Sequence, residues 1–391
     1  MTSVAAEDHR SATRACRAGP GTDPALVDLL VIGGGPGGIA AAVAAARAGA
    51  SVLLVDRGRF PRPKVCGGCL NARGVGVLER LGLADTLRDA PATDRFELAM
   101  NGRRLHASLP PGRAISRLAW DERMVAAAEA AGVQVLTETT ARVLPSEPGS
   151  VRTVTLDGPS GERTASARLV AAADGLTQSA TRSEPSLRTQ AKAGSRIGAG
   201  ALLPPDSLPS GTLRPGTIAM AAEATGYVGL VRVERNRVNV AAAMSVSAVR
   251  GRTLAEATAA ILATAGHAVP DGWHEADWTG TPPLTRSAPA GVASRLGCVG
   301  DAAGYVEPFT GEGMTWALAA GEAFGRRVPQ WCDDPAAMAR MWPAEFARVV
   351  SQRQRVCQAL AWLLKRPRLA RLAFPVAGPL VGPASRLINR T

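Results

Sequence analysis

The chain contains 391 residues, of which 46% are hydrophobic and 20% are charged. This usage is ordinary for globular proteins, so it excludes a disordered chain and a collagen-like fibre. The formal charge is +12, but only three of the 45 basic residues are lysines and they form no tract. We therefore predict no nucleic-acid partner, because a basic stripe interleaved with aromatic residues is missing.

Residues 1–25 mix charge, proline and glycine, and we expect a disordered tail that contains no secretory signal. The six cysteines are too sparse for a disulfide scaffold, which indicates a reducing, cytoplasmic environment.

A strand, a turn, a helix and a second strand open the predicted folded part. Val27 to Gly34 is a short apolar run of the parallel-strand type, and an alanine-rich helix is expected from about Gly37 to Ala48. Ser51 to Asp56 is the next apolar strand. The uncharged stretch from Leu29 to Ala46 could pass for a membrane span, but its glycine cluster indicates a turn between a buried strand and a buried helix.

Further along the chain, apolar periodicity predicts elements of both kinds. Helices are expected at 72–81, 118–131 and 311–325, and strands at 96–100, 103–107, 133–136, 151–156, 165–173, 227–233, 238–242 and 297–300. The predicted fold is mixed α/β (α+β), with a helical C-terminus. A discontinuous Rossmann-like domain (26–94, 113–183 and 285–330) is interleaved with a mostly antiparallel sheet domain (95–112 and 184–284), and residues 331–391 form a basic helical region.

The turn after the first strand carries the spacing Gly33-x-Gly35-x-x-Gly38, with Pro36 and Gly37 between its glycines. The first glycine permits the tight turn, the second lets a pyrophosphate approach the backbone, and the third lets helix and strand pack closely. The helix N-terminus then offers free N–H groups to the phosphates. Asp56 ends the second strand, where an acid accepts hydrogen bonds from the adenosine ribose, and Arg57 follows it. These residues predict a dinucleotide site.

Two later segments indicate that this dinucleotide is a flavin. Gly300-Asp301 ends a short strand, and an acid there can hold the ribityl hydroxyls. The segment that follows opens a helix whose positive end can stabilise a reduced flavin ring; its candidate cofactor residues are Pro308, Gly311, Gly313 and Met314. Glu312 lies in the same segment, either near the flavin or as an exposed helix-start acid. Asp174-Gly175 is the third element of the pattern.

With these three motifs in this order, the sequence resembles the FAD-dependent oxidoreductases that include group A flavoprotein monooxygenases and geranylgeranyl reductases. The resemblance covers residues 27–325 and implies bound FAD, with NAD(P)H as a transient reductant and no second nucleotide domain. It also implies that Arg117 contacts FAD, and that the loop containing Cys66 and Gly67, which is similar to the reductases' CGGG loop, lies near the flavin.

The resemblance leaves the reaction open. Tyr227 stands in a segment that keeps the tyrosine of the reductases' YxWxFP pattern but loses its Trp, Phe and Pro, and no Trp-x-Trp motif of flavin halogenases is present. We predict an oxidoreductase acting on a lipophilic small molecule. The sequence favours hydroxylation of a phenolic or polyketide-type secondary metabolite with molecular oxygen, because this asks for few acid–base residues. The alternative is reduction of an isoprenoid C=C bond, with Cys66 as the proton donor.

The pair Cys66-x-x-Cys69 has three interpretations. It can be a redox dithiol working with the flavin, or half of a zinc site, or Cys66 can be a wall residue beside the flavin with Cys69 in the core. We predict no metal site, because neither Cys298 nor the four histidines supply ligand spacing. Cys66, Tyr227 and Glu312 are the candidate catalytic residues.

Residues 360–390 alternate apolar clusters with basic residues. Such a segment can lie on an anionic membrane surface, so we also consider peripheral contact with the inner membrane face, beside a packed C-terminal helix pair.

Overall fold

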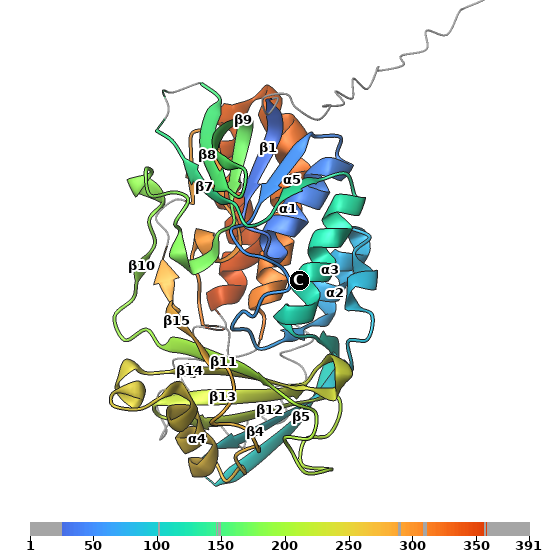
Figure 1. Ribbon diagram of the computed structural model, residues 1–391, viewed down its shortest axis with the longest axis vertical. Helices are drawn as coiled ribbons and strands as arrows, with labels where there is room; N and C mark the ends of the chain where they lie inside the picture. Colours follow the sequence, from blue (N-terminus) through green and yellow to red (C-terminus); the bar gives the residue numbers. More distant parts are fainter. Residues whose placement is uncertain are drawn as a thin grey trace, which may run out of the picture.

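The computed structural model describes residues 26–355 and 357, apart from 101, 146, 148–149, 288–290 and 308–310. The expected N-terminal tail, the basic segment 360–390 and the candidate residue Pro308 therefore lie outside the described residues. Two large sheets dominate the fold, one above the other in Figure 1.

The first sheet is built on five parallel strands in the order β6-β2-β1-β9-β18. Their bounds are β1 (Val27–Ile32), β2 (Val52–Val55), β6 (Gln134–Leu136), β9 (Gly161–Ala172) and β18 (Leu296–Cys298). Antiparallel strands are added as β7 (Thr140–Val143) and β8 (Arg152–Gly158) beside β9, and β17 (Val292–Ala293) beside β18. The central parallel strands are largely apolar where they pair: β2 is VLLV, β1 runs Leu29–Ile32 after Asp28, and β9 ends in a buried apolar run, as expected for strands covered on both faces.

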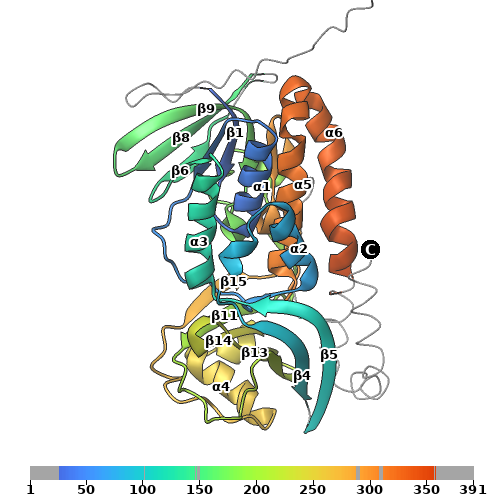
Figure 2. The ribbon, with the colours of Figure 1, turned by 90° about the vertical axis from the view of Figure 1, so that its right-hand side faces the viewer.

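Five helices pack over one face of this sheet and form its largest apolar core. They are α1 (Pro36–Arg47), α2 (Ala72–Arg80), α3 (Arg117–Ala130), α5 (Gly313–Asp333) and α6 (Pro335–Phe346), the last followed by one π-helical turn (Ala347–Ser351). Figure 2 shows α5 and α6 side by side, on the side opposite to the β8–β9 hairpin. Helices α1 and α5 approach closely: a Cβ on Gly321 would lie 2.2 Å from the Gly37 carbonyl oxygen.

The second sheet has the order β15-β11-β14-β13-β12-β4-β5-β3 and is antiparallel except between β12 and β4. Its strands are β3 (Cys69–Leu70), β4 (Ala92–Met100), β5 (Arg103–Ala114), β11 (Ile197–Leu203), β12 (Thr217–Glu223), β13 (Gly226–Arg232), β14 (Val238–Met244) and β15 (Thr279–Pro283). Helix α4 (Leu254–Thr264) packs on its outer face, so the inner face is turned toward the first sheet. A two-residue pair, β10 (Gln190–Ala191) with β16 (Arg286–Ser287), lies apart.

The expected α/β class and the expected elements are confirmed, most with differences of a few residues at their ends, whereas the helix expected at 311–325 continues to Asp333. The hairpin expected at 96–107 is longer, because β4 and β5 extend it to Ala92 and Ala114. The strand expected at 297–300 ends at Cys298, since Gly300–Ala303 forms a 3-10 turn. Helix α4 was not expected inside the sheet-rich region, although Thr253 and Glu256 form a capping box at its start.

Within the described residues, no helix is both long and apolar enough to cross a lipid bilayer.

Candidate active site

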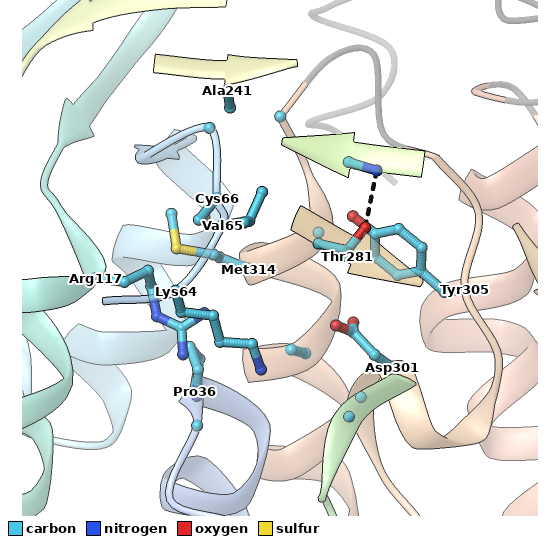
Figure 3. A pocket seen from close by; sticks show the side chains of 18 of the residues that line it. Pro36, Lys64, Val65, Cys66, Arg117, Ala241, Thr281, Asp301, Tyr305 and Met314 are labelled. Carbon is cyan, nitrogen blue, oxygen red and sulfur yellow. Dashed lines mark hydrogen bonds between the residues drawn. The ribbon is translucent and has the colours of Figure 1, made fainter. Parts of the chain in front are cut away.

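A cavity of about 1350 Å³ lies between the two sheets. The glycine turn after β1, the loop 62–67 and the segments around Asp174 and Asp301 form its first part, which we call the cofactor half. The inner face of the second sheet forms its apolar second part, the substrate half, with Phe96, Leu98, Met100, Leu105, Leu109, Met220, Ala241 and Ala243, together with Leu284 just after β15. Figure 3 shows side chains of both halves facing the same space.

The backbone shapes the phosphate end of the cofactor half. Gly33 has a φ of +113°, and a Cβ there would lie 2.3 Å from the Ala173 carbonyl oxygen; a Cβ on Gly38 would lie 1.9 Å from the Gly33 carbonyl oxygen. A Cβ on Gly35 would make an ordinary contact of 3.6 Å with Arg117 Nη2, and Gly35 lines the cavity as the N-cap residue of α1, without a side-chain hydrogen bond. The free N–H groups of the first turn of α1 therefore face a space that a phosphate can enter.

Asp56 lies at the end of β2 and lines the cavity. Its Oδ2 accepts a hydrogen bond from the Gly34 N–H at 2.7 Å, and its Oδ1 accepts one from the Gly58 N–H at 2.7 Å. The Arg62 guanidinium forms an ion pair with Oδ2 at 3.1 Å. The carboxylate thus ties the glycine turn to the loop after β2 and keeps one side toward the cavity.

Two further acids of the cofactor half are only partly satisfied by protein. Asp174 accepts a hydrogen bond from the Ala180 N–H on Oδ2 at 2.9 Å, whereas its buried Oδ1 has no partner among the described residues. Asp301 lines the cavity beside the N-terminal end of α5. Burial raises the pKa of both carboxyl groups, and the nearby Lys64 opposes this for Asp301. Unpaired carboxylates facing a cavity suit a ligand with several hydroxyl groups.

A family model described as an FAD binding domain matches residues 26–324. The chain belongs to this FAD-binding family. Its cofactor is FAD, and it is an FAD-dependent oxidoreductase. The glycine turn, the unpaired Asp174 oxygen and the cavity-facing Asp301 fit FAD, and NAD(P)H is the typical reductant in the family.

Relatives of this FAD-binding protein include reductases and a halogenase. It is 27% identical to a menaquinone reductase of Mycobacterium tuberculosis, over 93% of this chain and 89% of the relative. It is 30% identical to digeranylgeranylglycerophospholipid reductase 1 of Methanopyrus kandleri, over 38% of this chain and 40% of the relative. The fold matches that of the myxobacterial chondrochloren halogenase with a TM-score of 0.72 and 21% identity, over 86% of this chain and 82% of that one.

The predicted FAD-site residues gather around the cavity. Those that line it are Gly33, Gly35, Pro36, Gly37, Asp56, Arg57, Cys66, Gly67, Arg117, Asp174, Gly175, Gly300, Asp301, Gly311, Gly313 and Met314. Gly38 does not line the cavity. It lies where α1 packs against the end of β1, and its missing side chain allows this close contact. Arg117 begins α3 and forms a buried ion pair with Asp121, with Nη2–Oδ2 at 2.6 Å. Burial opposes its charge, but the charge and hydrogen bonds of Asp121, together with Cys66 and Asp301, outweigh burial and raise the pKa of Arg117.

Cys66 lies on the loop before β3 and Cys69 begins β3, and both line the cavity. Cys66 Sγ accepts a weak hydrogen bond from the Gly68 N–H at 3.5 Å, and Cys69 Sγ donates to the Gly67 carbonyl at 3.3 Å. Asn239 of β14 donates to the Cys66 carbonyl oxygen at 2.9 Å, so the second sheet holds this loop. Burial raises the pKa of the Cys66 thiol, and it raises that of Cys69 to about 12. Both groups are therefore thiols near neutral pH, which suits a proton donor better than a nucleophilic thiolate.

The other two candidate catalytic residues are also at the cavity, and each is engaged with protein. Tyr227 on β13 has a side-chain hydrogen bond with Glu307, which forms a buried ion pair with Arg196 at 2.9 Å. Glu312 is buried, so the alternative of an exposed helix-start acid is wrong. Its Oε1 accepts a hydrogen bond from the Asn71 side chain at 3.3 Å, and its Oε2 accepts one from Cys357 Sγ at 3.3 Å.

Two cavity residues were not expected from the sequence. Lys64 extends between Arg117 and Asp301 (Figure 3), and desolvation together with Arg117 lowers its pKa. Tyr305 points into the cavity four residues after Asp301. Both tyrosines of the chain line this cavity, but only Tyr227 lies in a segment with a recognisable pattern, and no sequence signal marked Tyr305.

Proposed function

We propose that this FAD-dependent oxidoreductase reduces a carbon–carbon double bond of a lipophilic isoprenoid, with NAD(P)H as the source of electrons. The observation that carries the proposal is the position of Cys66. Its protonated thiol lines the cavity on the loop that leaves the cofactor half, while Asn239 of the second sheet holds that loop in place.

Reduction of a double bond adds one hydride and one proton. Reduced FAD supplies hydride chemistry when it is bound. The chain's own residues must then orient the substrate, exclude water and deliver the proton. The substrate half provides the apolar wall. The Cys66 Sγ–H provides a proton for the second carbon, and the thiolate left behind regains a proton from solvent. Arg117, a neighbouring fixed cation, stabilises that thiolate.

The relatives support this reaction by their printed names. The match to the menaquinone reductase extends over nearly the whole of both chains, and the second relative is a digeranylgeranylglycerophospholipid reductase. The cavity wall leaves room beside β14, because Ala241 and Ala243 present only methyl groups there. A substrate wider than a bare prenyl chain is therefore expected.

The test is anaerobic stopped-flow spectroscopy of the FAD-loaded protein. Flavin reduced by NADPH is mixed with geranylgeranyl compounds and with prenylated naphthoquinones, and the product is identified by mass spectrometry. We expect reoxidation without oxygen and a mass gain of two hydrogens on the prenyl chain, rather than on the quinone ring alone. Cys66→Ser is expected to slow this step by about 100-fold, with flavin reduction by NADPH unchanged. Cys332→Ser, on a cysteine outside the cavity lining, is the matched control.

Hydroxylation, which the sequence alone favours, is the second candidate function. The apolar substrate half supports it, because such a wall shields a reactive oxygenating cofactor from water. In the same experiment, hydroxylation would show strict dependence on molecular oxygen and a product heavier by one oxygen atom. That result, with no anaerobic reoxidation by any prenyl compound, would overturn the reductase proposal.

A further inference from the structure

We propose that Tyr305 donates a hydrogen bond to an oxygen atom of the substrate, so that the cavity selects lipophilic compounds bearing a carbonyl group and discriminates against pure hydrocarbons. The inference rests on the proposed function only in that the substrate occupies the substrate half of this cavity. It adds a recognition residue and the chemical class of the group that is recognised.

The backbone holds Tyr305 firmly at the boundary between the two halves. The residue follows the 3-10 turn that begins with Gly300 and Asp301. Its N–H donates to the Arg286 carbonyl at 3.0 Å, and its carbonyl accepts from the Arg286 N–H at 2.8 Å. These two backbone hydrogen bonds fix the position of Tyr305, and its side chain projects into the cavity beside Thr281 (Figure 3).

The polar neighbours of Tyr305 in the substrate half are already committed to protein. Thr281 Oγ1 accepts from the Gly198 N–H at 2.8 Å and donates to the Pro282 carbonyl at 2.9 Å. The Tyr227 hydroxyl is engaged with Glu307. For Tyr305, by contrast, the described part of the chain shows no side-chain hydrogen bond. Its hydroxyl group is therefore available to donate a hydrogen bond to a ligand in the cavity.

The chemistry of the surrounding wall makes this hydroxyl selective. Tyr305 packs against an apolar cluster that includes Leu98, Met220 and Leu284. Burial, followed by the nearby Asp301, raises the pKa of the phenol well above its usual value, so the group is a neutral donor across the physiological range. A donor in an apolar wall loses its hydrogen bonds to water when a hydrocarbon fills the space, but it regains one when the ligand presents a carbonyl oxygen.

The experiment is an equilibrium titration of the oxidised, FAD-loaded protein, followed by the perturbation of the flavin absorbance. The probes are a matched pair, 2-methyl-1,4-naphthoquinone and 2-methylnaphthalene, which share a ring system and differ in their carbonyl groups. We expect the quinone to bind at least about tenfold more tightly to the wild-type protein. Tyr305→Phe should reduce this ratio to below about threefold by weakening the quinone alone.

Tyr227→Phe is the matched control. This variant removes the hydroxyl that is engaged with Glu307, so it should preserve most of the discrimination. An unchanged ratio in Tyr305→Phe, provided that this variant retains its FAD, would overturn the inference. Equal affinities of the wild-type protein for the two probes would overturn it without any variant. The titration involves no turnover, so it tests only the role of Tyr305 in binding. The reductase proposal is tested separately, by the anaerobic reoxidation of the flavin.

Discussion

The two halves of the cavity are built by different means. In the cofactor half, backbone atoms set the shape: Gly33 and Gly38 bring peptide groups so close that one added methyl group would collide with a carbonyl oxygen. In the substrate half, side chains set the shape, and a Cβ on Gly229 would meet the sulfur of Met220, the flexible end of a side chain.

This difference predicts that the cofactor half tolerates little change, whereas the substrate half is adaptable. A backbone cradle tolerates almost no substitution, whereas a wall of Met, Leu and Ala can be reshaped by single side chains at modest cost. Binding of FAD and choice of substrate are therefore expected to respond very differently to mutation.

The largest expected effect is that of Gly38→Ala. Its Cβ would lie 1.9 Å from the Gly33 carbonyl oxygen, so β1 and α1 must separate. We expect a loss of about 3 kcal/mol in the free energy of unfolding and loss of bound FAD, measured by denaturant titration and flavin content. Gly229→Ala is the matched change in the substrate half and should cost less than about 1 kcal/mol. Similar losses in both variants would contradict the contrast between the halves.

Asp301→Asn is expected to separate cofactor affinity from stability. Burial raises the pKa of Asp301 above its ordinary value of 3.8, so the unfolded chain ionises more readily and the FAD-free protein loses stability as pH rises from that value toward the raised pKa. The amide removes this cost. FAD content should fall, while the melting temperature of the FAD-free protein near pH 7 should rise relative to wild type. Full retention of FAD would refute this placement of the cofactor.

Glu234→Gln tests whether the second sheet supports the cofactor half. Glu234 is buried after β13 and accepts hydrogen bonds from Ser116 N at 2.9 Å and Ser116 Oγ at 2.6 Å. Ser116 caps α3, which begins with Arg117. We expect FAD affinity to fall several-fold and stability by about 1 kcal/mol. Glu256→Gln, in the exposed capping box of α4, should leave FAD affinity unchanged in the same titration.

The smallest expected effect concerns the reactivity of Cys66. Because burial raises its thiol pKa, alkylation by iodoacetamide at pH 8 should be slower than that of a free cysteine, and the rate should keep rising above pH 9. Mass spectrometry of the Cys66 peptide measures this, with the Cys332 peptide, whose thiol pKa burial raises to about 11, as an internal reference. Fast alkylation at neutral pH would instead favour a redox role for the Cys66–Cys69 pair.

The contrast between the halves also marks what the sequence could predict. The cofactor residues follow from Gly33-x-Gly35-x-x-Gly38 and from acids at strand ends, because these positions are required by local backbone geometry. Lys64 and Tyr305 belong to no spaced pattern, so the sequence did not indicate that they face the cavity. The buried pair of Arg196 and Glu307 joins residues 111 positions apart, and only the tertiary fold brings such partners together.

The close approach of α1 and α5 has a consequence for biosynthesis. Gly321 and Gly325 let α5 lie directly on the backbone of α1, where a Cβ would be 2.2 Å and 2.3 Å from carbonyl oxygens. The apolar face of α1 is thus made early, but its covering helix is translated about 280 residues later. A nascent chain that has not yet released α5 from the ribosome exposes that alanine-rich face and has an incomplete FAD site, so loading of the cofactor is expected to be a late event in the synthesis of each molecule.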